Sequence, residues 1–137
     1  MIGIDTNVLV RYIAEDDPEQ TALANKLIDQ NSSKEKPVFI TLLVICELVW
    51  VLSRAYKCNR EQITEVLQNL LLTENFVIEH HDIAWQALHD FKNINADYPD
   101  CLISRINQAF ECQTTWTFDK KASKLPHNTL LSNITFN

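Results

Sequence analysis

The sequence predicts an α/β protein whose mainly parallel sheet is covered by helices on both faces. Two observations lead to this prediction. Short runs rich in β-forming residues alternate along the chain with longer segments whose apolar residues recur at helical spacing. The strand candidates are separated from one another by these helical segments, which is the arrangement of crossover connections in parallel sheets. In open parallel sheets ligands bind at the carboxyl ends of the strands, so a functional site is expected there.

Five segments are strand candidates, which gives a sheet of four or five strands. Four short runs cover residues 1–4, 38–40, 76–78 and 114–118, and a last edge strand is expected within residues 129–136. The chain has no internal repeat, and its clearly polar stretch, residues 31–37, is short enough to be a loop. A single domain spanning residues 1–137 is therefore expected.

Helices are expected between the strands, over residues 8–14, 18–30, 42–54, 60–72, 82–94 and 99–110, with a short helix after Asp119. Thr41 directly precedes the third of these helices and is a residue type that commonly caps a helix start. His80 and His81 lie between a strand and a helix, with no further His or Cys at ligand spacing. We therefore interpret them as a turn rather than a metal site.

The composition is that of an ordinary globular protein, 46% hydrophobic and 22% charged over 137 residues. No apolar run approaches the roughly 20 residues of a membrane helix. The first residues lack the features of a secretory signal, so a cytoplasmic protein with no membrane partner is expected. The four cysteines are widely spaced, which predicts ordinary thiols. The net charge of −6 counts against a nucleic-acid coat protein, although lysines gather at positions 120, 121 and 124.

Acidic residues lie at the ends of several predicted elements. Asp5 follows the first strand and Asp119 follows the strand at residues 114–118. Asp97 and Asp100 flank the start of a helix. Each could simply cap or begin a helix, and for Asp5 taken singly capping is the favoured interpretation.

Glu47 is harder to explain as a structural residue. It lies within residues 42–52, where apolar side chains occur on almost every side of the expected helix, which predicts a helix buried all round. A carboxylate buried there costs several kcal/mol unless it is paired with a cation or protonated. The two explanations are a salt bridge or solvent stripe shared with an arginine such as Arg54, and a metal ligand.

The four carboxylates could meet at one edge of a parallel sheet; they are Asp5, Glu47, Asp100 and Asp119. Such a cluster repels itself unless a cation neutralises it. Oxygen-only ligands favour Mg²⁺ or Mn²⁺ over zinc. Either ion suits phosphoryl chemistry, because it polarises the phosphate and lowers the pKa of a bound water.

The chain resembles the PIN-domain nucleases, in particular the VapC-like toxins of bacterial type II toxin–antitoxin pairs. The matching segments together span residues 4–122; they are residues 4–9, Thr41 with Glu47, residues 96–103 and residues 117–122. The resemblance implies a three-layer α/β/α sandwich, commonly dimeric, that cleaves RNA at phosphodiester bonds with a bound Mg²⁺ or Mn²⁺.

The resemblance also assigns roles to individual residues. The acidic cluster that binds the metal and carries catalysis would be Asp5, Glu47, Asp100 and Asp119. Thr6, Asn7 and Thr117 would support it by hydrogen bonds, and Asp97 would be an auxiliary acid. Lys120 and Lys121, which follow Asp119, are candidates for phosphate contact. The implied partners are RNA, a second copy of the chain, and a small antitoxin that inserts a basic side chain among the carboxylates.

Two other functions are compatible with parts of the sequence. A haloacid-dehalogenase-like phosphatase also begins with an aspartate after a first strand, but it needs a second aspartate two residues later, where this chain has Asn7. A PIN-like module that binds RNA or protein without cutting would have no need of the four carboxylates. Base stacking by tryptophan was a further possibility, but the positions of Trp50, Trp85 and Trp116 favour core packing.

Overall fold

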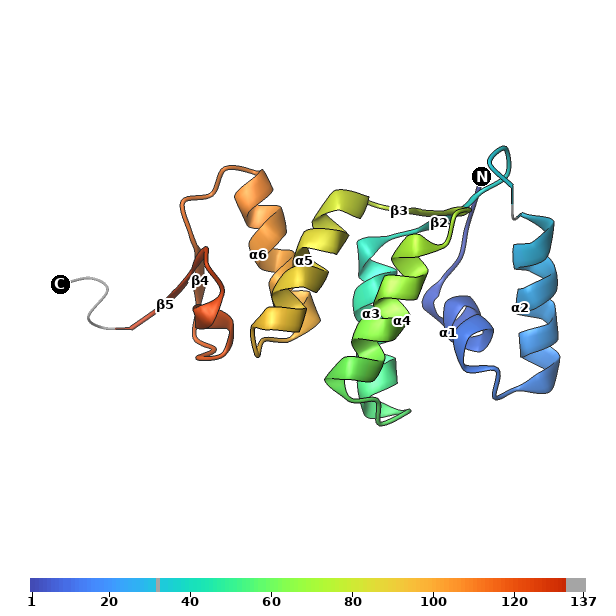
Figure 1. The fold of residues 1–137 in the computed structure, drawn as a ribbon, viewed down its shortest axis with the longest axis horizontal. Coiled ribbons are helices and arrows are strands. Elements are labelled where there is room, and N and C mark those ends of the chain that lie inside the picture. Colours follow the sequence, from blue (N-terminus) through green and yellow to red (C-terminus); the bar gives the residue numbers. More distant parts are fainter. Residues whose placement is uncertain (32, 133–137) are drawn as a thin grey trace. The chain divides into compact units, whose positions relative to one another are not determined.

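The computed structural model describes residues 1–31 and 33–132, and the chain divides into two compact units. Unit 1 comprises Met1–His81 and unit 2 comprises Asp82–Asn137. Each unit has its own parallel sheet and its own helices, and each is described by itself (Figure 1).

Unit 1 is built on a three-stranded parallel sheet in the order β1-β2-β3. Strand β1 is Ile2–Gly3, β2 is Val38–Ile40 and β3 is Phe76–Ile78. The register places Ile2 opposite Val38, and Val38 opposite Phe76. Parallel strands leave their carboxyl ends at the same edge, so the segments that follow β1 and β2 begin beside one another.

Four helices complete unit 1: α1 (Thr6–Ala14), α2 (Pro18–Gln30), α3 (Leu42–Arg54) and α4 (Arg60–Leu72). Helix α1 packs against both α2 and α3, and α3 packs against α4 (Figure 1). The helices bury one apolar stripe each, and the core residues include Leu9, Ile28, Leu48 and Leu67.

Unit 2 pairs two helices with a second parallel sheet. Its elements are α5 (His81–Asn93), α6 (Tyr98–Ala109), β4 (Thr115–Thr117), the 3₁₀ helix η1 (Ala122–Lys124) and β5 (Asn128–Leu130), and β4 pairs with β5. The fully buried Tyr98 joins the two helices, because its hydroxyl donates to the carbonyl oxygen of Ala84 at 2.9 Å. Its ring also meets that of Phe91 edge-on, with centroids 5.9 Å apart.

The predicted α/β class with parallel strands is confirmed, as are the positions of the helices. Thr41 caps α3, because its hydroxyl oxygen accepts from the Val44 backbone N–H at 3.1 Å. The cysteines are free thiols. The predicted last strand begins near the expected place but ends at Leu130, and residues 133–136 of that prediction lie outside the described residues. Among the helices of the described chain, none has the length and apolar character needed to cross a membrane.

Candidate active site

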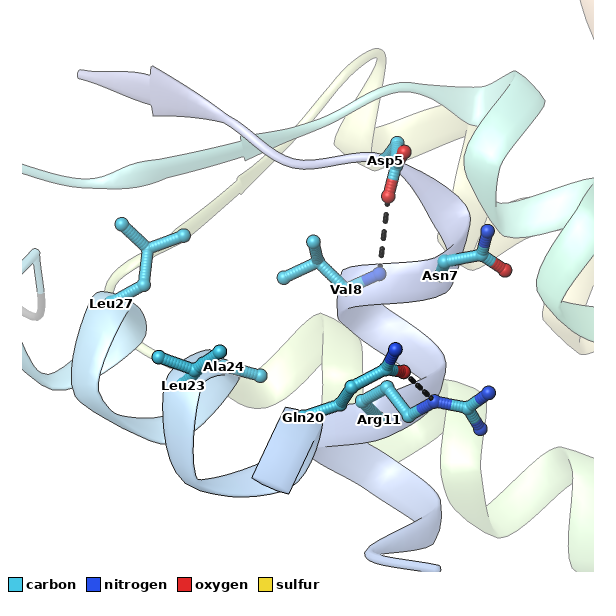
Figure 2. Close-up of a pocket in the computed structure, with 8 residues that line it drawn as sticks. All are labelled: Asp5, Asn7, Val8, Arg11, Gln20, Leu23, Ala24 and Leu27. Carbon is cyan, nitrogen blue, oxygen red and sulfur yellow. Dashed lines mark hydrogen bonds between the residues drawn. The ribbon is translucent and has the colours of Figure 1, made fainter. Parts of the chain in front are cut away.

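Asp5 lies just beyond β1 and caps α1. Its Oδ1 accepts from the Val8 backbone N–H at 3.1 Å, and its extended backbone (φ −90°, ψ 178°) is the usual conformation of a capping residue (Figure 2). The capping interpretation is therefore confirmed. Capping engages one carboxylate oxygen and fixes the orientation of the second, so it does not compete with a role in binding a cation.

Glu47 is exposed, so the prediction of a helix buried all round was wrong. Helix α3 buries the stripe that contains Ile45, Leu48 and Leu52. An exposed stripe runs along another face and consists of Leu43, Glu47, Trp50 and Arg54, at spacings of four, three and four residues. These spacings place the side chains on one face of a helix. The solvent stripe shared with Arg54, one of the two explanations offered for Glu47, is therefore confirmed.

Asp5 and Glu47 line the same cleft. This cleft, of about 430 Å³, lies between the start of α1 and the middle of α3 and is lined by Asp5, Thr6, Asn7, Val44, Glu47, Trp50 and Val51. The packing of α1 on α3 thus brings together two carboxylates that are 42 positions apart in the sequence. We call this space the α1–α3 cleft.

Unit 2 contains a second group of carboxylates around the start of α6. Asp97 is the residue before α6, with extended backbone, and Asp100 is in the first turn of the helix. Burial raises the pKa of Asp100, and the negative charges of Asp97 and Asp119 raise it further. Asp97 and Asp119 are therefore each close enough to Asp100 to repel its negative charge. We call them the α6 carboxylate group.

Asp119 is held in a tight turn after β4. Its Oδ1 accepts from the backbone N–H groups of Lys121 at 2.8 Å and Ala122 at 3.1 Å. Its own backbone N–H donates to the Thr117 hydroxyl oxygen at 3.0 Å, so Thr117 supports the turn that positions this acid. Lys120 and Lys121 are exposed on the same turn. Like Asp5, Asp119 has one carboxylate oxygen fixed by backbone donors.

The donor chemistry of both groups suits a hard divalent cation. Within residues 1–31 and 33–132, arginine forms ion pairs with Asp16 and Asp90, and no predicted site carboxylate is neutralised by a basic side chain. Carboxylates that repel one another without a partner are stabilised by a bound cation, and oxygen donors suit hard divalent cations. Across the described residues, no three His, Cys, Asp or Glu side chains form a ready-made metal-binding group.

The sequence interpretation missed two features of unit 1. Trp50, expected in the core, is 59% exposed and lines the α1–α3 cleft; Trp116 is also exposed, and Trp85 is half-buried. A mostly apolar groove of about 310 Å³ lies between α1 and α2, beside Asp5 and Asn7 (Figure 2). Two of its leucines, Leu23 and Leu27, are exposed.

Parallel strands connected by helices define an α/β protein, and each of its two units has unpaired carboxylates just beyond a strand. Residues 2–128 match the PIN domain family, and the chain belongs to that family. Among curated proteins it is similar to a VapC ribonuclease from Aquifex aeolicus (strain VF5). The two are 27% identical over 127 residues, which cover 93% of each chain.

Proposed function

We propose that this protein is a metal-dependent endoribonuclease, the toxin of a toxin–antitoxin pair, and that Asp5, Glu47, Asp100 and Asp119 hold its Mg²⁺ or Mn²⁺. The observation that carries the proposal is that a PIN-family chain has Asp5 and Glu47 in one cleft with no cationic partner among the described residues. Similarity to a VapC ribonuclease supports RNA as the substrate. Neither alternative function has a comparable observation in its favour.

The chemistry divides between the ion and the chain. When bound, a divalent cation supplies a polarised phosphate and a water of lowered pKa. Asp5 and Asp119, each with one oxygen held by backbone N–H groups, offer the second oxygen in a fixed orientation. Glu47 or Asp119 orients the attacking water, and Thr6, Asn7, Asp97 and Thr117 support the ligands. Lys120 and Lys121 contact the phosphate of the substrate.

Paired aspartate substitutions at helix starts test the proposal. Asp5 and Asp17 both cap a helix by accepting a backbone N–H, but only Asp5 lines the cleft. Asparagine caps about as well as aspartate, so Asp5→Asn and Asp17→Asn should both fold. Loss of an outer partner of a metal ligand typically costs 10–100-fold in activity, so loss of a ligand should cost at least about 100-fold.

The measurement is cleavage of 5′-labelled single-stranded RNAs of defined sequence, with Mg²⁺, Mn²⁺ or EDTA. We expect Asp17→Asn to retain cleavage, and we expect Asp5→Asn and EDTA each to abolish it. Full activity of Asp5→Asn with unchanged metal dependence would overturn the assignment. Hydrolysis of a small phosphomonoester without RNA cleavage would instead indicate a phosphatase.

The partner expected for such a toxin is a small basic protein that masks the site. The net charge of −6 favours a basic partner, and the exposed Leu23 and Leu27 beside Asp5 offer it an apolar contact. A short reading frame immediately upstream of this gene, if the genome contains one, encodes the candidate partner. Inhibition of cleavage by that partner should be lost when its arginines and lysines near the site are replaced by alanine. Inhibition that survives those replacements would contradict a basic partner. The proposal also includes that the protein is a homodimer and that it acts in the cytoplasm.

A further inference from the structure

Trp50 is an exposed aromatic side chain inside the α1–α3 cleft. Its side chain is 59% exposed, and it lines the cleft with Asp5, Asn7 and Glu47. Helix α3 does not need it for its own packing, because the buried stripe is supplied by Ile45, Leu48 and Leu52. A tryptophan left exposed beside the polar groups of a cleft offers an apolar ring face to a ligand that enters the cleft.

The position of Trp50 along α3 relates it to the proposed site. Glu47 lies three residues earlier on the same exposed stripe, and Arg54 lies four residues later. At a rise of 1.5 Å per residue, these separations are about 4.5 Å and 6 Å along the helix axis. The guanidinium carbon of Arg54 lies over the indole ring, 5.6 Å from its centroid. The stripe therefore presents an acid, an aromatic ring and a cation in sequence.

The aromatic ring and the cation of this stripe each suit one part of a nucleotide, the base and the phosphate respectively. An indole stacks on any nucleobase, and an arginine attracts the phosphate backbone while it adds a cation–π contact. Bases are available for stacking on a side chain where the RNA is single-stranded, because in a duplex they stack on each other. The negative charges of Glu47 and Asp5 repel RNA when no cation is bound. Trp50 and Arg54 add attractive contacts beside these carboxylates, in addition to the bound cation.

We propose that Trp50 stacks on one nucleobase of single-stranded RNA, next to the phosphodiester bond cleaved at Asp5 and Glu47, with Arg54 contacting the neighbouring backbone. Trp50 is thus a positioning residue that selects single-stranded substrate. This inference rests on the proposed ribonuclease function.

Binding and cleavage measurements on the full chain test the role of the ring. A single-stranded RNA that carries a fluorescein label and a non-hydrolysable linkage at the cleavage site is bound to the protein in Mg²⁺, and its Kd is measured by anisotropy. Base–aromatic stacking predicts that Trp50→Ala raises the Kd about tenfold, whereas Trp50→Phe keeps it within about threefold. Leu72→Ala, which truncates another exposed apolar side chain of unit 1 outside the cleft, should leave the Kd unchanged. With a cleavable RNA, Trp50→Ala should raise KM for cleavage and leave kcat nearly unchanged.

RNAs that lack one base at successive positions locate the stacked nucleotide. At a single position next to the cleavage site, removal of the base should weaken binding, and there Trp50→Ala should cause no further loss. A merely structural role for Trp50 would give the same loss with every RNA in the series.

Three results would overturn the inference. In the first, Trp50→Ala binds and cleaves RNA as well as Leu72→Ala does. In the second, Trp50→Ala weakens the binding of every RNA that lacks one base to the same extent. In the third, Trp50→Ala changes the oligomeric state in sedimentation velocity without changing RNA affinity, which would make the stripe a protein contact. Absence of RNA cleavage by the unmodified chain would remove the proposed function and this inference together, whereas unaltered behaviour of Trp50→Ala alongside active cleavage removes the inference alone.

Discussion

At the scale of single residues, the pKa of Asp100 depends on the charges of neighbouring carboxylates. Burial is the largest cause of its raised pKa, followed by the charges of Asp97 and then Asp119. Removal of one charge by Asp97→Asn should therefore lower the pKa of Asp100. The pKa should still stay above the ordinary value of 3.8, because the effect of burial remains. Carbon-detected NMR titration in EDTA measures it.

The control for this titration is Asp82→Asn, which removes an exposed carboxylate at the start of α5 that does not act on Asp100. If the pKa of Asp100 is unchanged in Asp97→Asn, then Asp97 does not act on Asp100 and does not belong to the α6 carboxylate group. The raised pKa of Asp100 also determines how the stability of the fold changes with pH. The folded state keeps the Asp100 proton to higher pH than the unfolded chain does. Ionisation of Asp100 therefore lowers the free energy of unfolding as pH rises through the folded-state pKa.

At the scale of elements, the start of α3 is held by two side chains outside the helix. The Thr41 hydroxyl oxygen accepts from the Val44 N–H, and the Glu79 carboxylate, from just beyond β3, accepts from the Leu42 N–H at 3.0 Å. Loss of a cap typically costs about 1 kcal/mol. Thr41→Ala should lower the free energy of unfolding by about that amount in urea, whereas Thr41→Ser, which keeps the oxygen, should lower it far less. Equal losses in the two variants would show that the methyl group, and not the cap, is what matters.

In unit 2, a mostly buried ion pair joins α5 to α6. Arg105 donates from Nε to Asp90 Oδ2 at 2.7 Å and from Nη2 to Asp90 Oδ1 at 2.8 Å, and Asp90 is only 4% exposed. Arg105→Met leaves a buried carboxylate without its partner and should lower the free energy of unfolding by about 3 kcal/mol or more.

The exposed pair Arg11–Asp16 provides the control for this prediction. Arg11→Met breaks a surface ion pair, which is worth about 1 kcal/mol or less. Urea denaturation of both variants gives the comparison. The double variant Asp90→Leu with Arg105→Met should recover much of the loss, because no buried charge remains unpaired. If Arg105→Met lowers the free energy of unfolding as little as Arg11→Met does, then water reaches Asp90.

Local signals were sufficient to predict most elements. The bounds predicted for the strands at residues 38–40 and 76–78 and the helices at residues 18–30 and 60–72 are those of the structure. The capping roles of Asp5 and Thr41 also follow from residue type and position. These features depend on contacts within a few residues, which the order of the amino acids contains directly.

Features that depend on packing between elements were not predictable in the same way. Glu47 and Trp50 lie on a face of α3 that its neighbours leave uncovered, and hydrophobicity does not say which apolar stripe of a helix is buried. The Asp90–Arg105 pair escaped notice because it joins two helices. The positions of Asp5 and Glu47 after strands, together with the family resemblance, led us to expect them in one site. The cleft that they share is formed by the packing of α1 on α3, which the sequence does not show directly.

At the scale of the whole molecule, the proposal that the four carboxylates hold one or two divalent cations makes a quantitative prediction about stability. A ligand that binds only the folded state at 100 times its Kd raises the free energy of unfolding by about 2.7 kcal/mol. Mg²⁺ or Mn²⁺ should therefore raise the Tm of the unmodified protein by several degrees relative to EDTA. If one ion needs ligands from both units, then Asp5→Asn in unit 1 and Asp100→Asn in unit 2 should each abolish nearly the whole increase.

Separate ions in the two units would give a different result. Each single variant would then lose only part of the metal-dependent increase in Tm, and only Asp5→Asn combined with Asp100→Asn would lose all of it. Asp17→Asn, which removes a carboxylate at a helix start outside the cleft, should keep the full increase and so exclude a general effect of charge. Because the measurement follows unfolding in EDTA and in metal, it needs no RNA substrate. It therefore tests the shared cation independently of whether the RNA chosen for the cleavage assay is the natural target.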